Sequence, residues 1–400
     1  MRRYNIVDLF AGTGGMGLAA LSAAQFRDSG RIVWTAELNP RYVGVISRNY
    51  RKHSQTIGTV EQTPAKCVPI DLSQACAVDV AKATRARWGR IDLMLAGPPC
   101  QGFSLANRRS RSHENPLNRL SLLAADFVRI LEPRVLILEN VPGIRTLRMR
   151  SDTNETATEI LQRRLRRLGY ACTVIVLDAA DYGVPQFRLR SFLVAARGFQ
   201  SLPQDMLPPP SHGPERRFPY VTVKDALSDL PPVTNGSCAM EVNYVNKPSS
   251  AFQKRMRRFS DGRLTDHLTS RHSAYVLERY ARIPQGGNWT SIRRLLSNYS
   301  EVNRTHLNIY HRLQPNVPTR TIGNFRKAMT IHPWENRGLS LREAARLQSI
   351  PDWFSFADPA QPMTREVVPG LNAYQQQIGN AVCYLLTEKL VSHVAKSLEL

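Results

Sequence analysis

A short apolar run, a glycine-rich loop and a helix-favouring stretch open the chain, and this order constrains the fold most. Residues 4–10 form the run, residues 11–17 carry four glycines, and residues 18–24 are apolar and suited to a helix. Glycines let a backbone approach a ligand closely, and a helix start offers unpaired N–H groups. The order predicts the first unit of a nucleotide-binding α/β fold. A tight turn that binds nothing gives the same pattern, so the loop alone leaves both readings open.

Acidic residues follow the next two apolar runs. The run at 31–36 ends in Glu37, and the run at 67–70 ends in Asp71. An acid at the tip of a second strand is placed to bind ribose hydroxyls, and the same logic makes Asp71 a candidate for an adenine amino group. A solvated loop acid is the plain alternative for either residue.

A fourth apolar run, at 91–96, breaks into Gly-Pro-Pro at 97–99, and the next residue is Cys100. Proline cannot continue a central strand. A cysteine on a fixed turn at a strand end is where an α/β fold presents a nucleophile. Most free cysteines are buried and inert, but a core cysteine needs no such turn. We therefore interpret Cys100 as a nucleophile.

Two later strand ends also carry polar groups. The apolar run 135–138 is followed by Glu139 and Asn140, and a strand-end glutamate by itself is more often a cap or surface residue. Before the apolar run 191–196, Gln186, Arg188 and Arg190 alternate with other residues. Alternation along a strand points all three side chains one way. Two convergent arginines can neutralise a carboxylate and an anionic base.

Charge and cysteine usage bound the function further. The chain of 400 residues has 54 Lys and Arg against 32 Asp and Glu, a net charge of +22. Such an excess predicts a polyanionic partner, most plausibly nucleic acid, although a basic soluble protein or an anionic membrane would also fit. The six cysteines form no C-x-x-C pair, which argues against structural zinc and a disulfide framework. No signal peptide or membrane-spanning run is visible, so a cytoplasmic location is expected.

The remaining chain is irregular up to about residue 300 and then regains recognisable elements. From residue 198 it shows Pro-rich connectors and basic clusters without βα alternation, which predicts an inserted module. Ser340 to Glu343 has the capping-box pattern of a helix start. Near the end, residues 374–382 are expected to open the last helix, and residues 377–382 read Gln-Ile-Gly-Asn-Ala-Val.

These blocks, in this order, resemble the DNA (cytosine-5) methyltransferases of the bacterial modification type. The segments that carry the resemblance are Asp-Leu-Phe-Ala-Gly-Thr-Gly-Gly at 8–15, Pro-Pro-Cys-Gln at 98–101, Glu-Asn-Val at 139–141, Gln-x-Arg-x-Arg at 186–190 and the block at 377–382. The resemblance implies the Rossmann-like α/β fold of S-adenosylmethionine-dependent methyltransferases. That fold is a doubly wound, mostly parallel sheet with a smaller, irregular target-recognition domain. The implied bounds are 1–197 for the catalytic domain, 198–315 for target recognition and 316–400 for a segment that returns to the catalytic domain.

The resemblance also assigns roles to single residues. Glu37 is expected to hold ribose, Asp71 adenine, and Arg190 to lie near the cytosine O2 and Glu139. The loop 107–113, with Gln101 and Ser104 at its near end, is expected to close over DNA. One departure is Gly17, where many relatives carry a bulkier or polar residue. The implied catalytic set is Cys100, Glu139, Asn140, Arg188 and Arg190, and the implied cofactor-binding set is Phe10, Gly12, Thr13, Gly15, Glu37, Asp71, Pro99, Asn380 and Val382.

The implied activity is methyl transfer from S-adenosylmethionine to carbon 5 of a cytosine flipped out of double-stranded DNA. Cys100 would bond to carbon 6, S-adenosylhomocysteine would be the product, and no metal would be needed. A bacterial monomer is expected, nucleoid-associated when acting, free of membranes, and serving a restriction–modification system beside a separate endonuclease. Two alternatives stay open: a tRNA cytosine-5 methyltransferase built on the same blocks, and a catalytically silent DNA-binding module.

Overall fold

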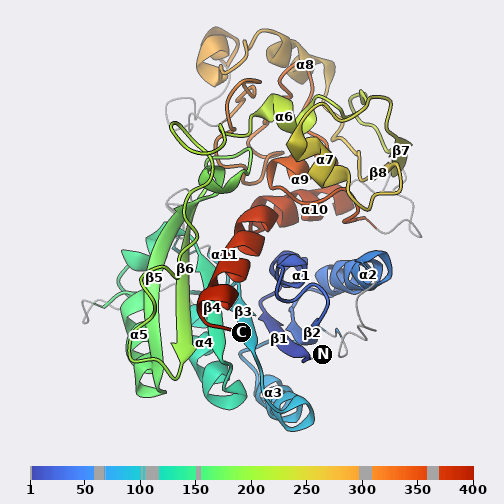
Figure 1. Cartoon of the computed structure of the whole chain (residues 1–400). Coiled ribbons are helices and arrows are strands. Elements are labelled where there is room, and N and C mark those ends of the chain that lie inside the picture. Colours follow the sequence, from blue (N-terminus) through green and yellow to red (C-terminus); the bar gives the residue numbers. More distant parts are fainter. Residues whose placement is uncertain are drawn as a thin grey trace. The chain divides into compact units, whose positions relative to one another are not determined.

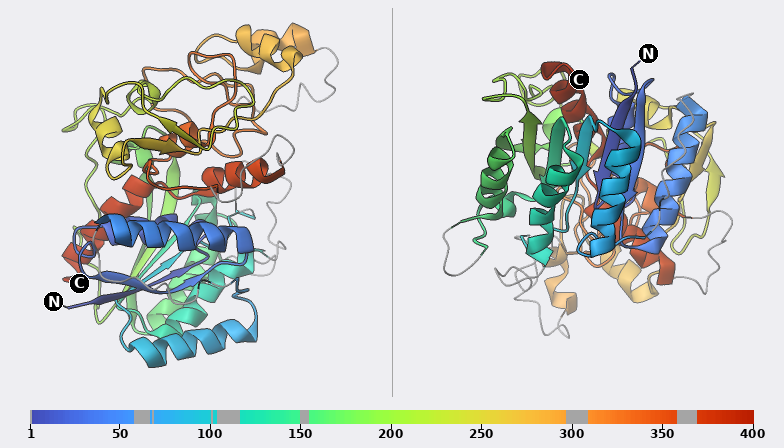
Figure 2. Two further views of the ribbon diagram at one scale, coloured as in Figure 1. Left: turned by 90° about the vertical axis from the view of Figure 1, so that its right-hand side faces the viewer. Right: turned by 90° about the horizontal axis from the view of Figure 1, so that it is seen from below.

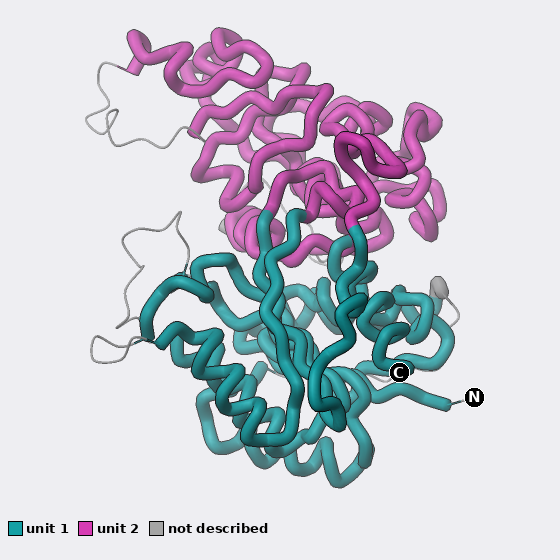
Figure 3. The backbone as a smooth tube through the Cα atoms, turned by 60° about the vertical axis from the view of Figure 1, so that its left-hand side comes forward, with its two compact units in different colours: residues 1–178, 189–209, 386–400 teal, residues 179–188, 210–385 magenta. Residues whose placement is uncertain are grey.

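The computed structural model describes residues 2–57, 67, 69–100, 102–103, 117–149, 155–296, 309–357 and 369–400. The backbone divides into two compact units (Figure 3). Unit 1 comprises Met1–Asp178, Leu189–Pro209 and Leu386–Leu400, and unit 2 comprises Ala179–Arg188 and Pro210–Leu385. These units follow from backbone packing, so the functional division at residues 197 and 315 stays a prediction.

Unit 1 is built on a six-stranded sheet with the strand order β2-β1-β3-β4-β6-β5 (Figure 1). The first four strands in this order are parallel, whereas β6 runs antiparallel to both β4 and β5. The mostly parallel α/β sheet predicted from the sequence is therefore confirmed. The strands are β1 (Tyr4–Leu9), β2 (Gly30–Ala36), β3 (Leu93–Ala96), β4 (Val135–Asn140), β5 (Tyr170–Asp178) and β6 (Leu189–Arg197).

Helices cover both faces of this sheet. Figure 2 shows α3, α4 and α5 on one face and α11 on the opposite face, while α1 packs against β1 and β2. A parallel sheet that is covered on both sides buries both faces of its strands, and five of the six residues of β1 are buried. The helices are α1 (Gly15–Ser22), α2 (Pro40–Ile57), α3 (Ala75–Trp88), α4 (Leu117–Leu131), α5 (Ala157–Arg167) and α11 (Tyr384–Ser397), with the 3-10 turn η1 at Pro142–Arg145.

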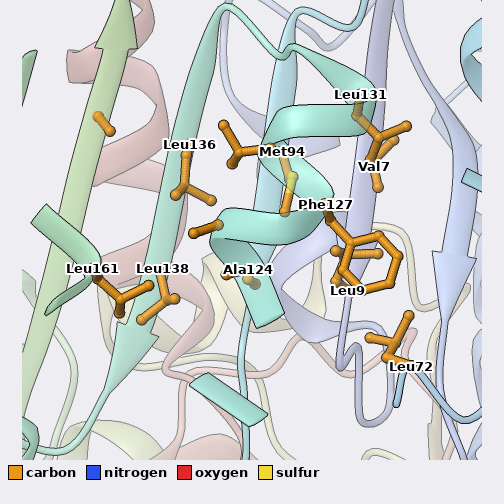
Figure 4. Close-up of a cluster of buried hydrophobic side chains, with 14 of the residues drawn as sticks. Val7, Leu9, Leu72, Met94, Ala124, Phe127, Leu131, Leu136, Leu138 and Leu161 are labelled. Atoms are coloured by element: carbon orange, nitrogen blue, oxygen red, sulfur yellow. The ribbon is translucent and has the colours of Figure 1, made fainter. Parts of the chain in front are cut away.

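The main hydrophobic core of unit 1 lies between the sheet and α4 (Figure 4). Alternate residues of the strands face this helix, for example Leu136 and Leu138 on β4, which are both buried. From α4, Phe127 and Leu131 belong to the same buried cluster, together with Val7 of β1. This core fixes the central strands as a rigid platform, because close-packed interiors do not deform without cost.

Two sequence-based expectations differ from the structure. The apolar run at 67–70 was expected to be a strand, but the structure has one parallel bridge there, between Glu37 and Pro69. Residue 68 lies outside the described residues, and only the N–H of Ile70 extends the pairing, to the Glu37 carbonyl at 2.8 Å. The block at 377–382 was expected to open the last helix, but α10 (Pro369–Asn380) ends within it, before α11 begins at Tyr384.

Unit 2 shows no βα alternation among its described residues, as the sequence predicted. It contains short helices and one two-stranded sheet joined by irregular segments. Its elements are η2 (Ala179–Tyr182), α6 (Val223–Leu227), β7 (Glu241–Asn243), α7 (Ala251–Arg257), β8 (Arg263–Thr265), α8 (Ala274–Ala281), η3 (Trp289–Leu296), α9 (Leu341–Leu347) and α10.

Helix α9 carries buried hydrogen bonds and ion pairs that stabilise unit 2. The predicted capping box is present, since Ser340 accepts from the N–H of Glu343, and the Glu343 side chain accepts from the Ser340 N–H. Arg346 of α9 is fully buried, with Nη1 2.9 Å from an Asp229 carboxylate oxygen and Nη2 2.6 Å from an Asp352 oxygen. Because a buried ion pair is costly to break on one side, these contacts tie α9 and the residues that follow it to the distant segment around Asp229.

We predict that Arg346→Leu destabilises unit 2 by about 3–5 kcal/mol, because two buried carboxylates lose a cation. Urea unfolding followed by circular dichroism measures the loss. Lys254→Leu on the exposed side of α7 is the matched control and should change the midpoint little. Equal midpoints for the two variants would show that the network does not stabilise the fold.

In unit 1, the backbone of η1 closely approaches the segment that follows β3. A Cβ atom at Gly143 would be 2.0 Å from the carbonyl oxygen of Phe103, a backbone atom that cannot rotate away. Phe103 itself is fully buried in the core. Any residue other than glycine at position 143 would therefore push η1 away from the backbone of Phe103.

We predict that Gly143→Ala destabilises the fold by about 1–3 kcal/mol, the usual cost of overpacking. The measurement is the free energy of unfolding in urea. Gly44→Ala on α2 is the control, because its Cβ would meet only the end of Arg48, at 3.6 Å. If both alanine variants unfold alike, the Gly143–Phe103 contact is not tight.

Candidate active site

The candidate site lies at one edge of the sheet in unit 1, where the carboxyl ends of the parallel strands meet (Figure 1). There β1 leads into Phe10, β2 into Glu37, and β3 into the turn that carries Cys100. Strand β4 ends at this edge with Glu139 and Asn140. Because β6 is antiparallel to β4, its first residues, Arg190 among them, reach the same edge. In open α/β sheets this edge is where ligands bind.

The glycine loop has a backbone that most side chains would not allow. Gly12 and Gly14 have φ values of 57° and 81°, and Gly14 is the N-cap of α1. Phe10 also has a positive φ, 54°, which marks local strain of the kind found at functional sites. A Cβ atom at Gly12 or Gly15 would meet nothing within 4 Å. The loop is therefore open on the side of these two glycines.

Glu37 is hydrogen-bonded to this loop. One of its carboxylate oxygens accepts from the N–H of Gly12 and the other from the N–H of Asn39, each at 2.8 Å. Burial raises the pKa of Glu37, and these backbone donors offset part of that rise. The hydrogen bonds fix the direction of the carboxylate at the tip of β2.

Asp71 differs in its surroundings. Its Oδ1 atom accepts from both the N–H and the hydroxyl of Ser73, at 2.9 and 2.7 Å. The hydrogen bonds from Ser73 lower the pKa of Asp71. This acid is therefore an ionised acceptor at neutral pH.

The turn that carries Cys100 is held from both sides. The Asn140 side-chain amide donates to the carbonyl of Pro98 at 3.2 Å, and its oxygen accepts from the N–H of Val141 at 2.8 Å. On the other side the N–H of Phe103 donates to the Cys100 carbonyl at 3.0 Å. Cys100 is half-buried between these fixed points.

Glu139 and Arg190 form a nearly buried ion pair. The Arg190 Nε atom lies 2.8 Å from a Glu139 carboxylate oxygen, and the two side chains are 10% and 11% exposed. Nη1 of Arg190 donates to the Leu189 carbonyl at 2.8 Å. The pairing expected between these two residues is therefore present in the geometry.

Arg188, Asn380 and Val382 belong to unit 2. The buried Arg188 guanidinium donates to the carbonyls of Ile322 and Gly379 at 2.8 Å, and to that of Ala381 at 3.1 Å. It thus holds the backbone on both sides of Asn380, which is exposed at the end of α10. Gln186, Arg188 and Arg190 are all buried, whereas the intervening Phe187 and Leu189 are exposed, which fits the expected alternation.

Some expected residues lie outside the described part of the chain, and some described residues were not expected. Gln101, Ser104 and the loop 107–113 fall outside it. Asp8 was not among the expected site residues, yet it is fully buried beneath the glycine loop. An acid in the middle of an apolar strand was the signal that could have identified it.

The described residues show neither a metal-binding cluster nor a membrane-spanning helix. They contain no group of three or more His, Cys, Asp or Glu side chains arranged to hold a metal ion. Among the same residues, no helix combines the length and the hydropathy needed to cross a bilayer.

Comparisons with known proteins identify the family. The model of the C-5 cytosine-specific DNA methylases matches residues 4–396. The Type II methyltransferase M.DdeI of Desulfomicrobium norvegicum is 30% identical over 98% of this chain and 88% of its own length. M1.HphI of Haemophilus parahaemolyticus, also a Type II methyltransferase, is 29% identical over 98% of this chain and 86% of its own length.

A solved structure agrees in fold. A prophage-encoded protein of E. coli, described as a DNA modification methyltransferase, superposes with a TM-score of 0.72 at 24% identity and covers 99% of this chain and 100% of its own. The family model spans nearly the whole sequence, and the open glycine loop and the Cys100 turn lie at the edge where this fold binds ligands. The chain belongs to the C-5 cytosine-specific DNA methylase family and is a DNA (cytosine-5) methyltransferase.

Proposed function

We propose that the chain methylates carbon 5 of a cytosine flipped out of double-stranded DNA, with Cys100 as the covalent nucleophile. The observation that carries this proposal is the clamped turn: Asn140 holds the Pro98 carbonyl two residues before Cys100, and the Phe103 N–H holds the Cys100 carbonyl. A nucleophile held in place avoids the entropic cost of finding its target. A base inside a duplex exposes neither face of carbon 6, so the target must leave the stack.

Cys100 has the first chemical role. Its thiolate adds to carbon 6, and the π electron pair of the carbon 5–carbon 6 double bond is delocalised over carbon 5 and ring nitrogen 3. Carbon 5 thereby becomes nucleophilic. Later a base takes the carbon 5 proton, the double bond reforms, and the thiolate leaves with the pair of the carbon–sulfur bond.

Glu139 and Arg190 stabilise the activated ring in this proposal. Glu139 acts in its protonated form: it donates its proton to ring nitrogen 3, which neutralises the charge that the thiolate pushes onto the base, and Arg190 pairs with the carboxylate left behind. Arg190 orients Glu139 through its Nε atom and, in this proposal, its guanidinium also contacts the O2 edge of the cytosine. Both residues are almost excluded from water, which strengthens such interactions.

The residues at the glycine loop fit S-adenosylmethionine, the cofactor implied by the family. The space beside Gly12 and Gly15 admits a ligand against the backbone. We propose Phe10, Thr13 and Pro99 as further cofactor contacts. Glu37 would accept from the ribose hydroxyls, and Asp71, kept ionised by Ser73, from the adenine amino group. The cofactor supplies an electrophilic methyl group on a sulfonium, and S-adenosylhomocysteine is the product.

Arg188 and the end of α10 have a supporting role in the proposal. The hydrogen bonds of Arg188 to Gly379 and Ala381 favour a positioning residue that sets Asn380 and Val382, in place of a residue that contacts the base. Asn380 and Val382 stay proposed cofactor-binding residues, as the family resemblance implies. The chemistry needs no metal, since an acid and a thiolate supply the activation.

Double-stranded DNA is the polymer that the observations favour. The net charge of +22 suits a duplex backbone, and the Type II names of the relatives point to modification of a short target sequence. The irregular segment 198–315 is where we place target recognition. The biological setting we propose is a monomeric bacterial modification enzyme that acts on the nucleoid, with a restriction endonuclease working separately. A tRNA substrate is not favoured, because the matched family is named for DNA.

Trapping on a fluorinated substrate tests the covalent role of Cys100. A duplex with 5-fluorocytosine at the target carries no removable proton at carbon 5, so we predict that the wild-type chain accumulates a complex that survives denaturation. Cys100→Ala should form none and lose methyl transfer by at least about 10³-fold, while cofactor binding stays within a few-fold.

The control for this trapping is Cys76→Ala, which changes an exposed cysteine at the start of α3 and should trap normally. A Cys100→Ala variant that still forms the complex, or still methylates at a near wild-type rate, would refute the nucleophile. Trapping on a tRNA but not on the duplex would favour the RNA alternative.

A further inference from the structure

A buried polar cluster lies beneath the glycine loop, outside the predicted ligand contacts. Asp8, in the middle of β1, is fully buried. Its Oδ2 atom accepts from the N–H of Gly17 at 3.1 Å and from the hydroxyl of Tyr50 at 3.3 Å. Gly17 is in the first turn of α1, and the almost fully buried Tyr50 comes from α2. One carboxylate thus joins a strand and two helices just below the loop.

Gly17 has no room for a side chain. A Cβ atom there would be 2.3 Å from the Tyr50 hydroxyl oxygen and 2.7 Å from Asp8 Oδ2. The Tyr50 hydroxyl therefore occupies the volume that a side chain at position 17 would take.

The side chains of this cluster are closely packed, but the hydrogen-bonding capacity of the Asp8 carboxylate is only partly used. In the described part of the chain, Asp8 Oδ1 is buried and has no hydrogen-bond partner. A buried carboxylate with an unpartnered oxygen is costly, and such groups are kept where they serve a function. An acid near the N-terminus of α1 is also stabilised by the partial positive charge there.

We propose that Asp8 and Tyr50 are positioning residues for the methyl donor: together they fix the first turn of α1 and so the open face of the glycine loop. This inference rests on the proposed cofactor role of that loop. Neither residue is assigned a ligand contact. They act through the backbone at Gly17, three residues beyond the Gly14 N-cap.

The charge of Asp8 provides a readout that a purely structural role would not change. Burial raises the pKa of Asp8 to about 7, the bonds from Gly17 and Tyr50 lower it, and the nearby Glu37 raises it. The thiol of Cys67 also lies within the field of Asp8. An ionised carboxylate accepts stronger hydrogen bonds than a neutral one. Cofactor affinity should therefore rise as the pH increases through about 7.

The decisive variant is Tyr50→Phe, with isothermal titration of S-adenosylmethionine at several pH values between 6 and 9. The Tyr50 hydrogen bond lowers the pKa of Asp8, so its loss should move the midpoint of the affinity profile to higher pH. At pH 7 we expect about tenfold weaker binding, the effect of one hydrogen bond to a charged group. Tyr4→Phe, at the opposite end of β1, is the control and should match wild type.

Two further variants keep the test decisive if Tyr50→Phe folds poorly. Asp8→Asn retains an acceptor for Gly17 but cannot titrate, so its affinity profile should be flat through neutral pH. Gly17→Ala should bind poorly, and adding Tyr50→Phe should restore part of the affinity, because the 2.3 Å contact disappears.

The outcomes separate this inference from the proposed function. A wild-type chain that binds no S-adenosylmethionine contradicts the proposed cofactor role itself. A wild type that binds, with Tyr50→Phe and Asp8→Asn giving the same profile and midpoint, overturns the positioning role while leaving the cofactor role intact.

Discussion

Burial of the central strands on both faces is the constraint on which the rest of unit 1 depends. Helices on either side leave these strands no room for solvated groups, so polar side chains collect where the strands end. Glu37, Cys100 and Glu139 all follow this rule, each at the end of its own parallel strand. The antiparallel β6 adds Arg190 to the same edge because it starts where its neighbours finish. The active site is thus a consequence of the sheet.

The chemistry at this edge depends on how firmly the backbone there is held. Asn140 illustrates this, because one side chain fixes both its own strand end and the carbonyl of Pro98 in the turn before Cys100. Asp8 does the same for the glycine loop through Gly17. In both cases a buried polar side chain forms hydrogen bonds with the backbone, and these hold the neighbouring reactive groups in a preorganised position.

Strand ends and turns could be predicted from the sequence because apolar runs and Gly-Pro breaks are local signals. The first α/β unit followed from them, whereas the proximity of Arg190 to Glu139 was implied by the resemblance to the cytosine-5 methyltransferases. Helix α2 was not predicted, although Val43, Ile46, Tyr50 and His53 are buried at helical spacing. The contact of Tyr50 with Gly17 and the hydrogen bonds of Arg188 join residues far apart in the chain, and no local pattern encodes such contacts. Their discovery needed the folded structure.

Bisulfite sequencing of plasmid DNA from a methylation-free host that expresses this chain tests the central claim most directly. Cytosines methylated at carbon 5 resist conversion, so the account predicts protected cytosines at one short, recurrent sequence, and full conversion when Cys100→Ala is expressed instead. Complete conversion with the wild-type chain, soluble and bound to S-adenosylmethionine, would contradict the account. Protection that persists with Cys100→Ala would contradict the role given to Cys100.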